Sequence, residues 1–424
     1  MASINERKNA TKRNTVYVYY RHREESGKTR QITVACQDRL EAERILPDVQ
    51  KAEAENRIYT KPQAVKRIET ITELLDGYFA YQLAKNGWRP STYDNYLRLR
   101  RNYVDPAIGD KRIAEVSRGF MYTFYDELRL KDAMPGNHIT PPSKISARTV
   151  KEINKILCPA FEWAVDRELI PFNPLQGMKK APYTPLKREQ WTVEEFQTAL
   201  SLCTDETLSL IMATMFFGTL RSCEAAGLKW DCVDCSSEFP SIQIEREIAV
   251  LDRTAIRDTH AAEYIEEIFS SNSATKRVIV LQRTLKTDAS NRRIYIPPAL
   301  AQQLKAHRER QEALQTEFPD FPQNGLVFEH DFGRPFTANL LNKRFKRFIR
   351  QNGLREVDMY SLRHSGATEK LRRTRDIKAV QADMGHTTSQ MLLNVYATVP
   401  EEDRRKTAND MNNILDGKNQ LGTV

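Results

Sequence analysis

An arginine, a histidine and a tyrosine lie close together near the end of the sequence. Arg363 stands in the segment SLRHSGAT, His386 follows Gly385, and Tyr396 comes ten residues after the histidine. Arginine keeps a positive charge that can bind phosphate, histidine can donate a proton, and tyrosine offers a hydroxyl nucleophile. Together these side chains could hold one phosphodiester and attack it.

The residues around this trio follow a helical pattern. Apolar Ile377 and Val380 recur at helical spacing before Gly385, which indicates the end of a helix. Thr387 or Thr388 is a suitable cap for the next short helix. We therefore expect short helices to position the histidine and the tyrosine.

Further polar residues of the same kind come earlier in the chain. Arg221 lies in TLRSCE, in a tight turn leading into a short helix, with Glu224 three residues later. Lys286 lies in LKTDASN, which we interpret as the tip of a hairpin between VIVLQRT and RRIYIP. Tyr360 stands three residues before Arg363. Taken alone, Arg363 with His364 would fit a plain surface pair and Tyr396 a core aromatic residue, so only the whole set argues for a site.

Composition favours a polyanionic partner. The 424 residues carry a net charge of +9, and the isoelectric point is near 9.1. Such an excess of lysine and arginine suits nucleic acid, although it also fits an ordinary soluble basic protein. No apolar run approaches the roughly 18 residues of a membrane span, and the start has no apolar signal segment. We predict a cytoplasmic protein that has no contact with a membrane.

Cysteine usage gives little reason to expect a metal. The six cysteines are scattered, which suits a reducing compartment, and only Cys232 and Cys235 form a CxxC pair. Without a second ligand pair nearby, this is a weak zinc signal. We predict no metal and no cofactor.

The pattern of elements predicts a mostly α protein with small β-sheets (α+β) and three domains. Residues 1–65 would form a small sheet-and-helix domain, 66–180 a helical domain, and 181–424 a mixed α/β domain with a tail helix. The segment 169–190 is rich in proline and lysine and has no helical period, so it is the clearest boundary.

In the first domain we expect a disordered basic arm over residues 1–12 and then a hairpin. Thr15–Arg21 and Arg30–Val34 alternate as strands around a turn at Gly27. Asp38 would open a helix with apolar Leu40 and Ile45, which Pro47 would end or kink. The sheet could place four cations along a groove for DNA, although a solvated sheet face would look the same: Arg21, Arg23, Lys28 and Arg30.

In the second domain we expect four helices. They begin at Ile71, at Ser91 as a cap, at Ser117 and at Ala147, and the segment VDPAIGD is expected to be a loop. The second helix carries a cluster of cations that could lie along a major groove, with a solvated charged face as the competing interpretation. The candidate DNA contacts there and in the following linker are Arg89, Arg98, Arg101, Lys179 and Lys180.

The last domain opens with a capping box, Thr192 to Glu195, and an apolar helix that ends at Gly218. Residues 251–275 look like a polar insertion with a helical middle at Ala261–Phe269. Helices are expected at Ala299–Thr316 and Ala338–Asn352.

These motifs in this order resemble the tyrosine recombinase family of the phage-integrase type. Arg221 with Glu224 matches the family's first box, Lys286–Thr287 before RRIYIP its lysine hairpin, and SLRHSGAT with MGHTTSQMLLNVYATV its second box and nucleophile segment. Residues 71–180 look like the family's core-binding domain. The first domain looks like the arm-binding domain of integrases from conjugative transposons and some phages.

The resemblance implies a role for each residue. Tyr396 would be the nucleophile, Arg221 and Arg363 would bind the phosphate, Lys286 would be the general acid, and His386 would hold the phosphate or the tyrosine. Glu224 would orient its neighbours. One departure is clear: Tyr360 stands where the family's second box usually has histidine. A phenol can donate a hydrogen bond, but it is a poor base near pH 7. His364, one place beyond Arg363 on a helix, points about 100° away and is expected to pack or cap.

The resemblance also implies a reaction and partners. We expect a site-specific recombinase that joins double-stranded DNA sites of a mobile element through a covalent 3′-phosphotyrosyl intermediate. It would act as a homotetramer through a Holliday junction, with an excisionase or host DNA-bending proteins as further partners. Two alternatives stay open: a type IB topoisomerase-like relaxing enzyme, and a non-catalytic DNA-binding relative.

Overall fold

The chain forms two compact units, Met1–Ile68 and Glu69–Val424, which we describe separately. The computed structural model describes residues 2–8, 14–24, 27–36, 39–59, 68–85, 87–133, 144–178, 189–269, 276–283, 291–320, 322–330, 333–385 and a few residues of the tail. The expected boundary at 180 falls between described segments. The division of 66–424 into two domains therefore stays a prediction.

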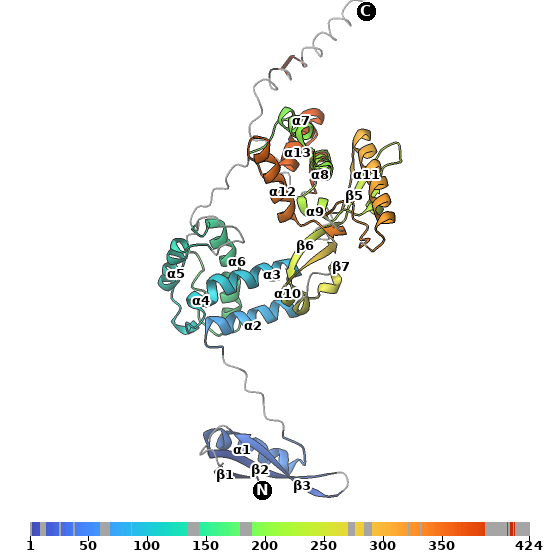
Figure 1. Cartoon of the computed structure of the whole chain (residues 1–424). Coiled ribbons are helices and arrows are strands. Elements are labelled where there is room, and N and C mark those ends of the chain that lie inside the picture. Colours follow the sequence, from blue (N-terminus) through green and yellow to red (C-terminus); the bar gives the residue numbers. More distant parts are fainter. Residues whose placement is uncertain are drawn as a thin grey trace, which may run out of the picture. The chain divides into compact units, whose positions relative to one another are not determined.

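The first unit is a three-stranded antiparallel sheet covered on one face by a helix (Figure 1). The strands, in spatial order, are β1 (Ser3–Lys8), β2 (Asn14–Arg23) and β3 (Thr29–Cys36), and the helix is α1 (Arg39–Ala54). Alternation in β2 puts Val16, Val18 and Tyr20 on one face, where they are buried with the apolar side of α1. The predicted hairpin is confirmed.

One expectation for this unit was wrong, and two others were met only in part. Ser3–Lys8 is a strand rather than part of a disordered arm, because its backbone pairs with β2 and Ile4 packs against the core of the unit. The helix does not end at Pro47, because burial of residues on both sides of the proline holds it together to Ala54. Of the two apolar residues expected in this helix, Ile45 is buried and Leu40 is 77% exposed. The helix start that we expected at Asp38 lies outside the described residues.

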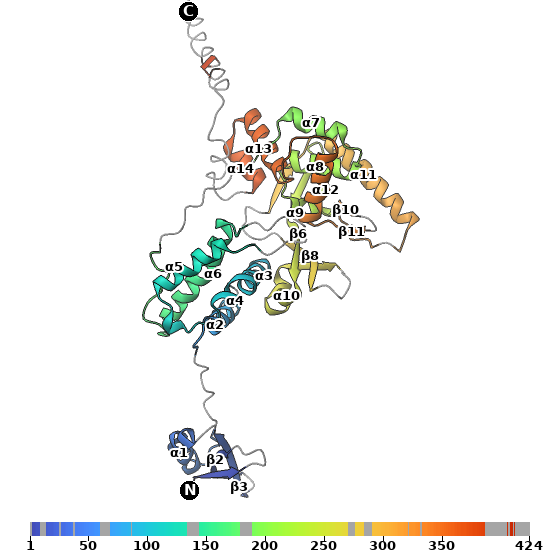
Figure 2. The same cartoon turned by 60° about the vertical axis from the view of Figure 1, so that its left-hand side comes forward.

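The second unit begins with a bundle of helices (Figures 1 and 2). They are α2 (Ile71–Ala84), α3 (Pro90–Leu99), α4 (Asp105–Ile108), α5 (Arg118–Leu130) and α6 (Ala147–Asp166). A π-helical turn, Arg100–Val104, joins α3 to α4, and a 3-10 turn lies at Ile113–Glu115.

The four predicted helices are present, with two differences. The cap of α3 is Arg89 rather than Ser91, because Pro90 occupies the first helical position, where its missing N–H has no cost. The expected loop VDPAIGD is wrong, because α4 continues the turn before it and again places a proline at its start.

The rest of the second unit mixes helices with small sheets. The helices are α7 (Val193–Leu202), α8 (Glu206–Phe217), α9 (Ser222–Ala226), α10 (Arg253–Asp258), α11 (Pro298–Glu317), α12 (Ala338–Gln351), α13 (Ser361–Thr374) and α14 (Ile377–Met384). One sheet has the order β4 (Val233–Asp234), β5 (Ser241–Ile244), β9 (Arg292–Tyr295). Another has the order β6 (Arg246–Asp252), β8 (Arg277–Arg283), β7 (Ile265–Phe269). A third, short pair is β10 (Glu329–His330) with β11 (Arg334–Pro335), and 3-10 turns lie at Trp230–Cys232 and Ala261–Glu263.

Two expectations about the sheets were wrong. The strands before and after Lys286 do not form a hairpin with each other among the described residues, since β8 pairs with β6 and β7 while β9 pairs with β5. The expected helical middle of the insertion contains the strand β7, because Ile265 and Phe269 add an edge to β8. The capping box at Thr192 and the helix stop at Gly385 are both confirmed.

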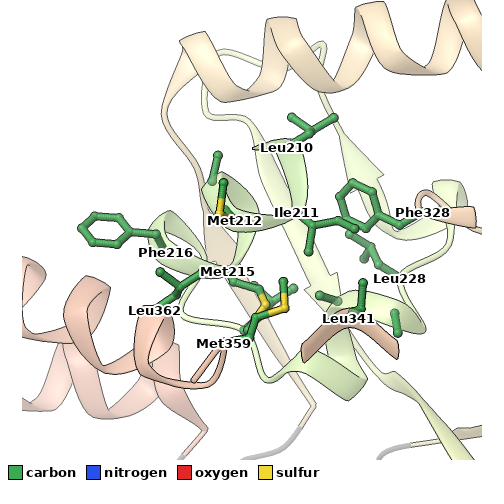
Figure 3. Packing of buried hydrophobic residues seen from close by; sticks show 14 of the residues in the cluster. Leu210, Ile211, Met212, Met215, Phe216, Leu228, Phe328, Leu341, Met359 and Leu362 are labelled. Atoms are coloured by element: carbon green, nitrogen blue, oxygen red, sulfur yellow. The ribbon is translucent and has the colours of Figure 1, made fainter. Parts of the chain in front are cut away.

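The core of this region forms around α8, as Figure 3 shows. Helix α8 buries residues on nearly every side, including Ile211 and Met215. Met359 and Leu362, at the start of α13, pack against it. Gly366 lets the two helices approach closely, because a Cβ atom there would lie 1.9 Å from the carbonyl oxygen of Phe216. This packing fixes the helix that carries Arg363. In the part of the chain described, no helix has the length and apolar character to cross a membrane.

Candidate active site

Arg221 sits at the start of α9, in a tight turn after α8. Its backbone N–H donates to Glu224 Oε2 at 2.8 Å, and its guanidinium donates to Glu224 Oε1. Thr219, two residues earlier, has a φ of +50°, a strained conformation for a β-branched residue. The arginine side chain keeps 28% of its surface exposed. Glu224 thus holds Arg221 in one orientation while leaving part of it open.

Glu224 is a buried carboxylate shared by three arginines. Its side chain is 1% exposed, and Arg292 donates to its two oxygens at 3.1 and 2.8 Å. Arg363 Nη1 lies 3.5 Å from Oε2. Burial alone would raise the pKa of Glu224, but the hydrogen bonds and charge of Arg292, with Arg221 and Arg363, lower it to about 2. The carboxylate therefore stays ionised at neutral pH.

Arg363 lies behind Arg221, in the first turn of α13, and has no exposed side-chain surface. Its Nη1 donates to the carbonyl oxygen of Thr219 at 2.8 Å, and its Nη2 donates to that of Met384. Burial and the nearby Arg221 lower the pKa of Arg363 to about 10, so it remains charged at pH 7. In this structure the guanidinium of Arg363 has no surface open to a phosphate.

Tyr360 is the residue that precedes α13, and it belongs to the same cluster. Its hydroxyl interacts electrostatically with the guanidiniums of Arg221 and Arg363. Its ring stacks edge-on against His364, with centroids 5.0 Å apart. His364 therefore packs, as expected, and the position usually held by histidine has a phenol close to both arginines.

Arg292 is the part of this cluster that the sequence interpretation missed. It lies on β9, is 7% exposed, and also donates from Nε to the carbonyl oxygen of Asp383 at 2.6 Å. A signal was present, because alternation along RRIYIP gives Arg292 the same side as the buried Ile294 and Ile296. An arginine on the core side of a strand requires a buried acidic partner.

A pocket of about 280 Å³ opens beside Arg221. Its lining includes Glu224, Glu247, Arg283 and Arg89, the cap of α3. The Arg89 guanidinium lies over the ring of Tyr264, 5.3 Å from its centroid. The structure therefore brings Arg89, a candidate DNA contact, to the same pocket as Arg221.

Five predicted residues lie outside the described part of the chain: Lys286, His386, Tyr396, Lys179 and Lys180. Their roles stay predictions. The described chain stops at Gly385, directly before His386, with a left-handed φ of +59°.

The predicted DNA contacts of the first unit do not share one face of the sheet. Arg21 and Arg23 are exposed on the face away from α1. Arg30 pairs with His22, on the face that α1 covers, and Lys28 is exposed in the turn. All four side chains are exposed, but they lie on different faces because alternate residues of a strand point to opposite sides, and their contact with DNA stays a prediction.

The cations of the helical bundle are of two kinds. Arg98 and Arg101 are exposed. Arg100, between them, is buried and paired with Asp76 at 2.7 Å and Asp105 at 3.0 Å. Arg100 is therefore structural, while the other two remain available to a partner. In the described part of the chain, no group of three His, Cys, Asp or Glu side chains could hold a metal ion.

A comparison with known protein families shows to which family this chain belongs. The model of the phage integrase family matches residues 190–402, half of the chain, and this stretch contains the whole arginine cluster. The chain belongs to the phage integrase family. Like other members, this integrase is a tyrosine-type site-specific recombinase.

Relatives cover most of this integrase. A tyrosine recombinase XerC-like protein of Caldanaerobacter subterraneus subsp. tengcongensis is 23% identical over 82% of this chain and 83% of its own. The ICEBs1 integrase of Bacillus subtilis is 23% identical over 64% of this chain and 67% of its own. The solved Tn1549 transposon integrase has the same fold, with a TM-score of 0.60 and 18% identity over 81% of this chain and 99% of that one. None of these lends support to the topoisomerase alternative.

Proposed function

We propose that this integrase cuts and rejoins double-stranded DNA with Tyr396 as its nucleophile, to integrate or excise a mobile element. The observation that carries the proposal is the charge of the cluster. Three guanidiniums surround the single carboxylate of Glu224, which leaves two positive charges in excess beside a pocket. A phosphodiester is an anion that would neutralise one of these two charges.

The chemistry assigns one task to each residue. The Tyr396 oxygen attacks phosphorus and loses its proton, and a 3′-phosphotyrosyl bond forms as the bond to the 5′-oxygen breaks. Lys286 gives the 5′-oxygen a proton. The reverse attack by a 5′-hydroxyl rejoins a strand, so the reaction needs no external energy source. His386 holds the phosphate or the tyrosine.

The arginines stabilise the charge that develops on the non-bridging oxygens. A preorganised donor of this kind contributes about 3–4 kcal/mol to the transition state. Arg221 is the first of them to meet DNA, because it is the one that lines the pocket. Arg363 supports the same charge from behind the pocket, and Tyr360 donates a hydrogen bond. Glu224 keeps the guanidiniums in a fixed orientation relative to one another.

DNA binding would use cations on both units. The open sheet face with Arg21 and Arg23 would bind arm sites, and Arg89, Arg98 and Arg101 would follow the core site. Lys28, Arg30, Lys179 and Lys180 are the remaining candidates. The Tn1549 integrase was solved with a circular intermediate DNA, and lambda integrase as a tetramer on a Holliday junction. By analogy we propose that this integrase works in the cytoplasm as a homotetramer on two DNA sites, with an excisionase or host DNA-bending proteins.

A suicide substrate tests the proposal. Duplex DNA that carries the element's junction, nicked next to the cleavage position, should trap a covalent protein–DNA adduct that denaturing gels detect. Tyr396→Phe should remove the adduct and leave non-covalent DNA binding intact. Adduct formation by the phenylalanine variant would refute the role of Tyr396 as the nucleophile. A wild-type chain that binds the site without forming an adduct would instead indicate a non-catalytic DNA-binding relative.

A further inference from the structure

Arg292 occupies an unusual position, because one side chain joins two parts of the site. Two of its nitrogens bind both oxygens of Glu224, which in turn orients Arg221. Its third nitrogen, Nε, donates to the carbonyl oxygen of Asp383 at 2.6 Å. Asp383 belongs to the last turn of α14, three residues before His386. The contacts of Arg292 therefore extend from the first arginine box to the entrance of the nucleophile segment.

The end of α14 is held by several donors in addition to its cap at Gly385, whose backbone N–H donates to the carbonyl oxygens of Ala382 and Gln381. Thr219 Oγ1 donates to the same Asp383 carbonyl oxygen at 3.2 Å, and Arg363 donates to that of Met384. The carboxylate of Asp383 pairs with Lys370 of α13. Helix ends need partners for their last carbonyl groups, and cations there also match the helix dipole. Here the partners are residues of the site itself.

We propose that Arg292 is a positioning residue for recombination, which sets where the chain enters the His386–Tyr396 segment relative to Arg221. The inference rests on the proposed function. A guanidinium suits this task because its planar fork can hold a carboxylate with two nitrogens while a third reaches the helix end. Arg292 need not touch DNA, and its burial keeps it from doing so in this structure.

Two substitutions separate this role from a contribution to folding. Arg292→Lys keeps a positive charge beside Glu224, but an ammonium cannot hold both carboxylate oxygens and the Asp383 carbonyl in the same geometry. Arg292→Gln removes the charge as well. We expect both variants to form adduct about 100-fold more slowly at saturating DNA, as when reacting groups are misplaced by about 1 Å. Affinity for DNA should not change, and the lysine variant should melt close to wild type.

The neighbouring residue provides a matched control. Arg293 follows Arg292 on β9, points to the opposite face and is exposed. Arg293→Gln should cleave at the wild-type rate. If Arg292→Lys also cleaves at that rate, the inference is overturned, because charge alone would then account for the residue.

A second substrate identifies which group Arg292 positions. In the sequence, Arg292 comes six residues after Lys286. The alternative is therefore that Arg292 positions Lys286, the general acid, rather than the nucleophile segment. DNA with sulfur in place of the 5′-bridging oxygen has a leaving group that needs no proton, so it should largely rescue Lys286→Ala. The Arg292 variants should stay slow on it. Rescue of Arg292→Gln by sulfur would overturn the inference, and a wild-type chain that forms no adduct on either substrate would overturn the proposed function and this inference together.

Discussion

The sheet of the first unit and the arginine cluster of the second use the same side chain in opposite ways. Arg21 and Arg23 have exposed side chains, and their backbone N–H groups donate to Glu53 and Asn56. Arg292 and Arg363 are buried, and hydrogen bonds to a carboxylate or to backbone carbonyls fix each of them. Exposed cations attract a polyanion through their number and spacing, and their effect depends on salt. Buried cations act through their orientation and are costly to misplace.

The sharpest test of this difference compares rate with affinity. We expect Arg221→Ala and Arg363→Ala to lower single-turnover cleavage by at least about 10²–10³-fold, the loss typical of one charge-stabilising donor. Their affinity for DNA should be largely unchanged. Arg23→Ala should weaken binding while the cleavage rate at saturating DNA stays the same. Filter binding and adduct formation measure the two quantities. A parallel loss of binding and cleavage in Arg221→Ala would contradict its assigned role.

Close backbone packing between α13 and α8 keeps the buried arginines in place, and a substitution of Gly366 tests this packing. In Gly366→Ala the new methyl group would meet the Phe216 carbonyl at 1.9 Å, so α13 must move away from α8. Overpacking of this kind costs about 1–3 kcal/mol or more, and the displacement should also slow cleavage because α13 carries Arg363. Thermal melting and adduct formation measure both effects.

Gly119→Ala is the matched control, since it is also a helical glycine. The nearest atom to its added methyl group would be Ser117 Oγ at 3.7 Å, which is ordinary contact. Alanine there should leave stability equal or slightly higher. If Gly366→Ala melts like Gly119→Ala, the close approach of α13 to α8 is not required.

Local signals in the sequence were enough for most helices. The capping box at Thr192 and the bounds Ala147–Asp166 match the structure, because caps and helical periodicity act within a few residues. Strand pairing depends on partners far along the chain, so the neighbours of β8 and β9 and the strand Ser3–Lys8 were not predictable in the same way.

The residue types of the site were predictable from the sequence, but the burial of its arginines was not. Arg221, Glu224, Tyr360 and Arg363 come together as the motifs implied. Nothing local indicated that Arg363 would be buried against the end of α14, because that contact joins distant segments. The alternation that marks Arg292 was visible, but its acidic partner lies 68 residues earlier in the chain.

The charge of Glu224 predicts a specific loss of stability in acid. Its folded pKa of about 2 lies below the ordinary 4.5, so its contribution is complete above pH 4.5 and is lost as the pH falls toward 2. Between pH 5 and pH 3 the wild type should lose about 2 kcal/mol more unfolding free energy than Glu224→Gln. Urea unfolding at the two pH values measures this.

An exposed glutamate provides the comparison for that experiment. Glu309 lies on α11 with an exposed side chain, so Glu309→Gln should lose stability in acid as the wild type does. Equal pH dependence in all three proteins would show that the arginines do not depress the pKa of Glu224.

The smallest expected effects belong to the exposed cations, and they show which face of the sheet meets DNA. Each phosphate contact contributes about 0.9 to the slope of log affinity against log salt, so the double variant Arg21→Gln with Arg23→Gln should lower that slope by about 2 on arm-site DNA. Arg30→Gln removes the same charge from an exposed side chain on the opposite face of the sheet, and it should change the slope by less than either single variant. Fluorescence anisotropy at several salt concentrations measures the slopes. An equal change for Arg30→Gln would mean that the net charge of the unit, rather than its open face, attracts DNA. The exposed arginines of the first unit would then differ even more from the buried arginines of the second, which act through their orientation.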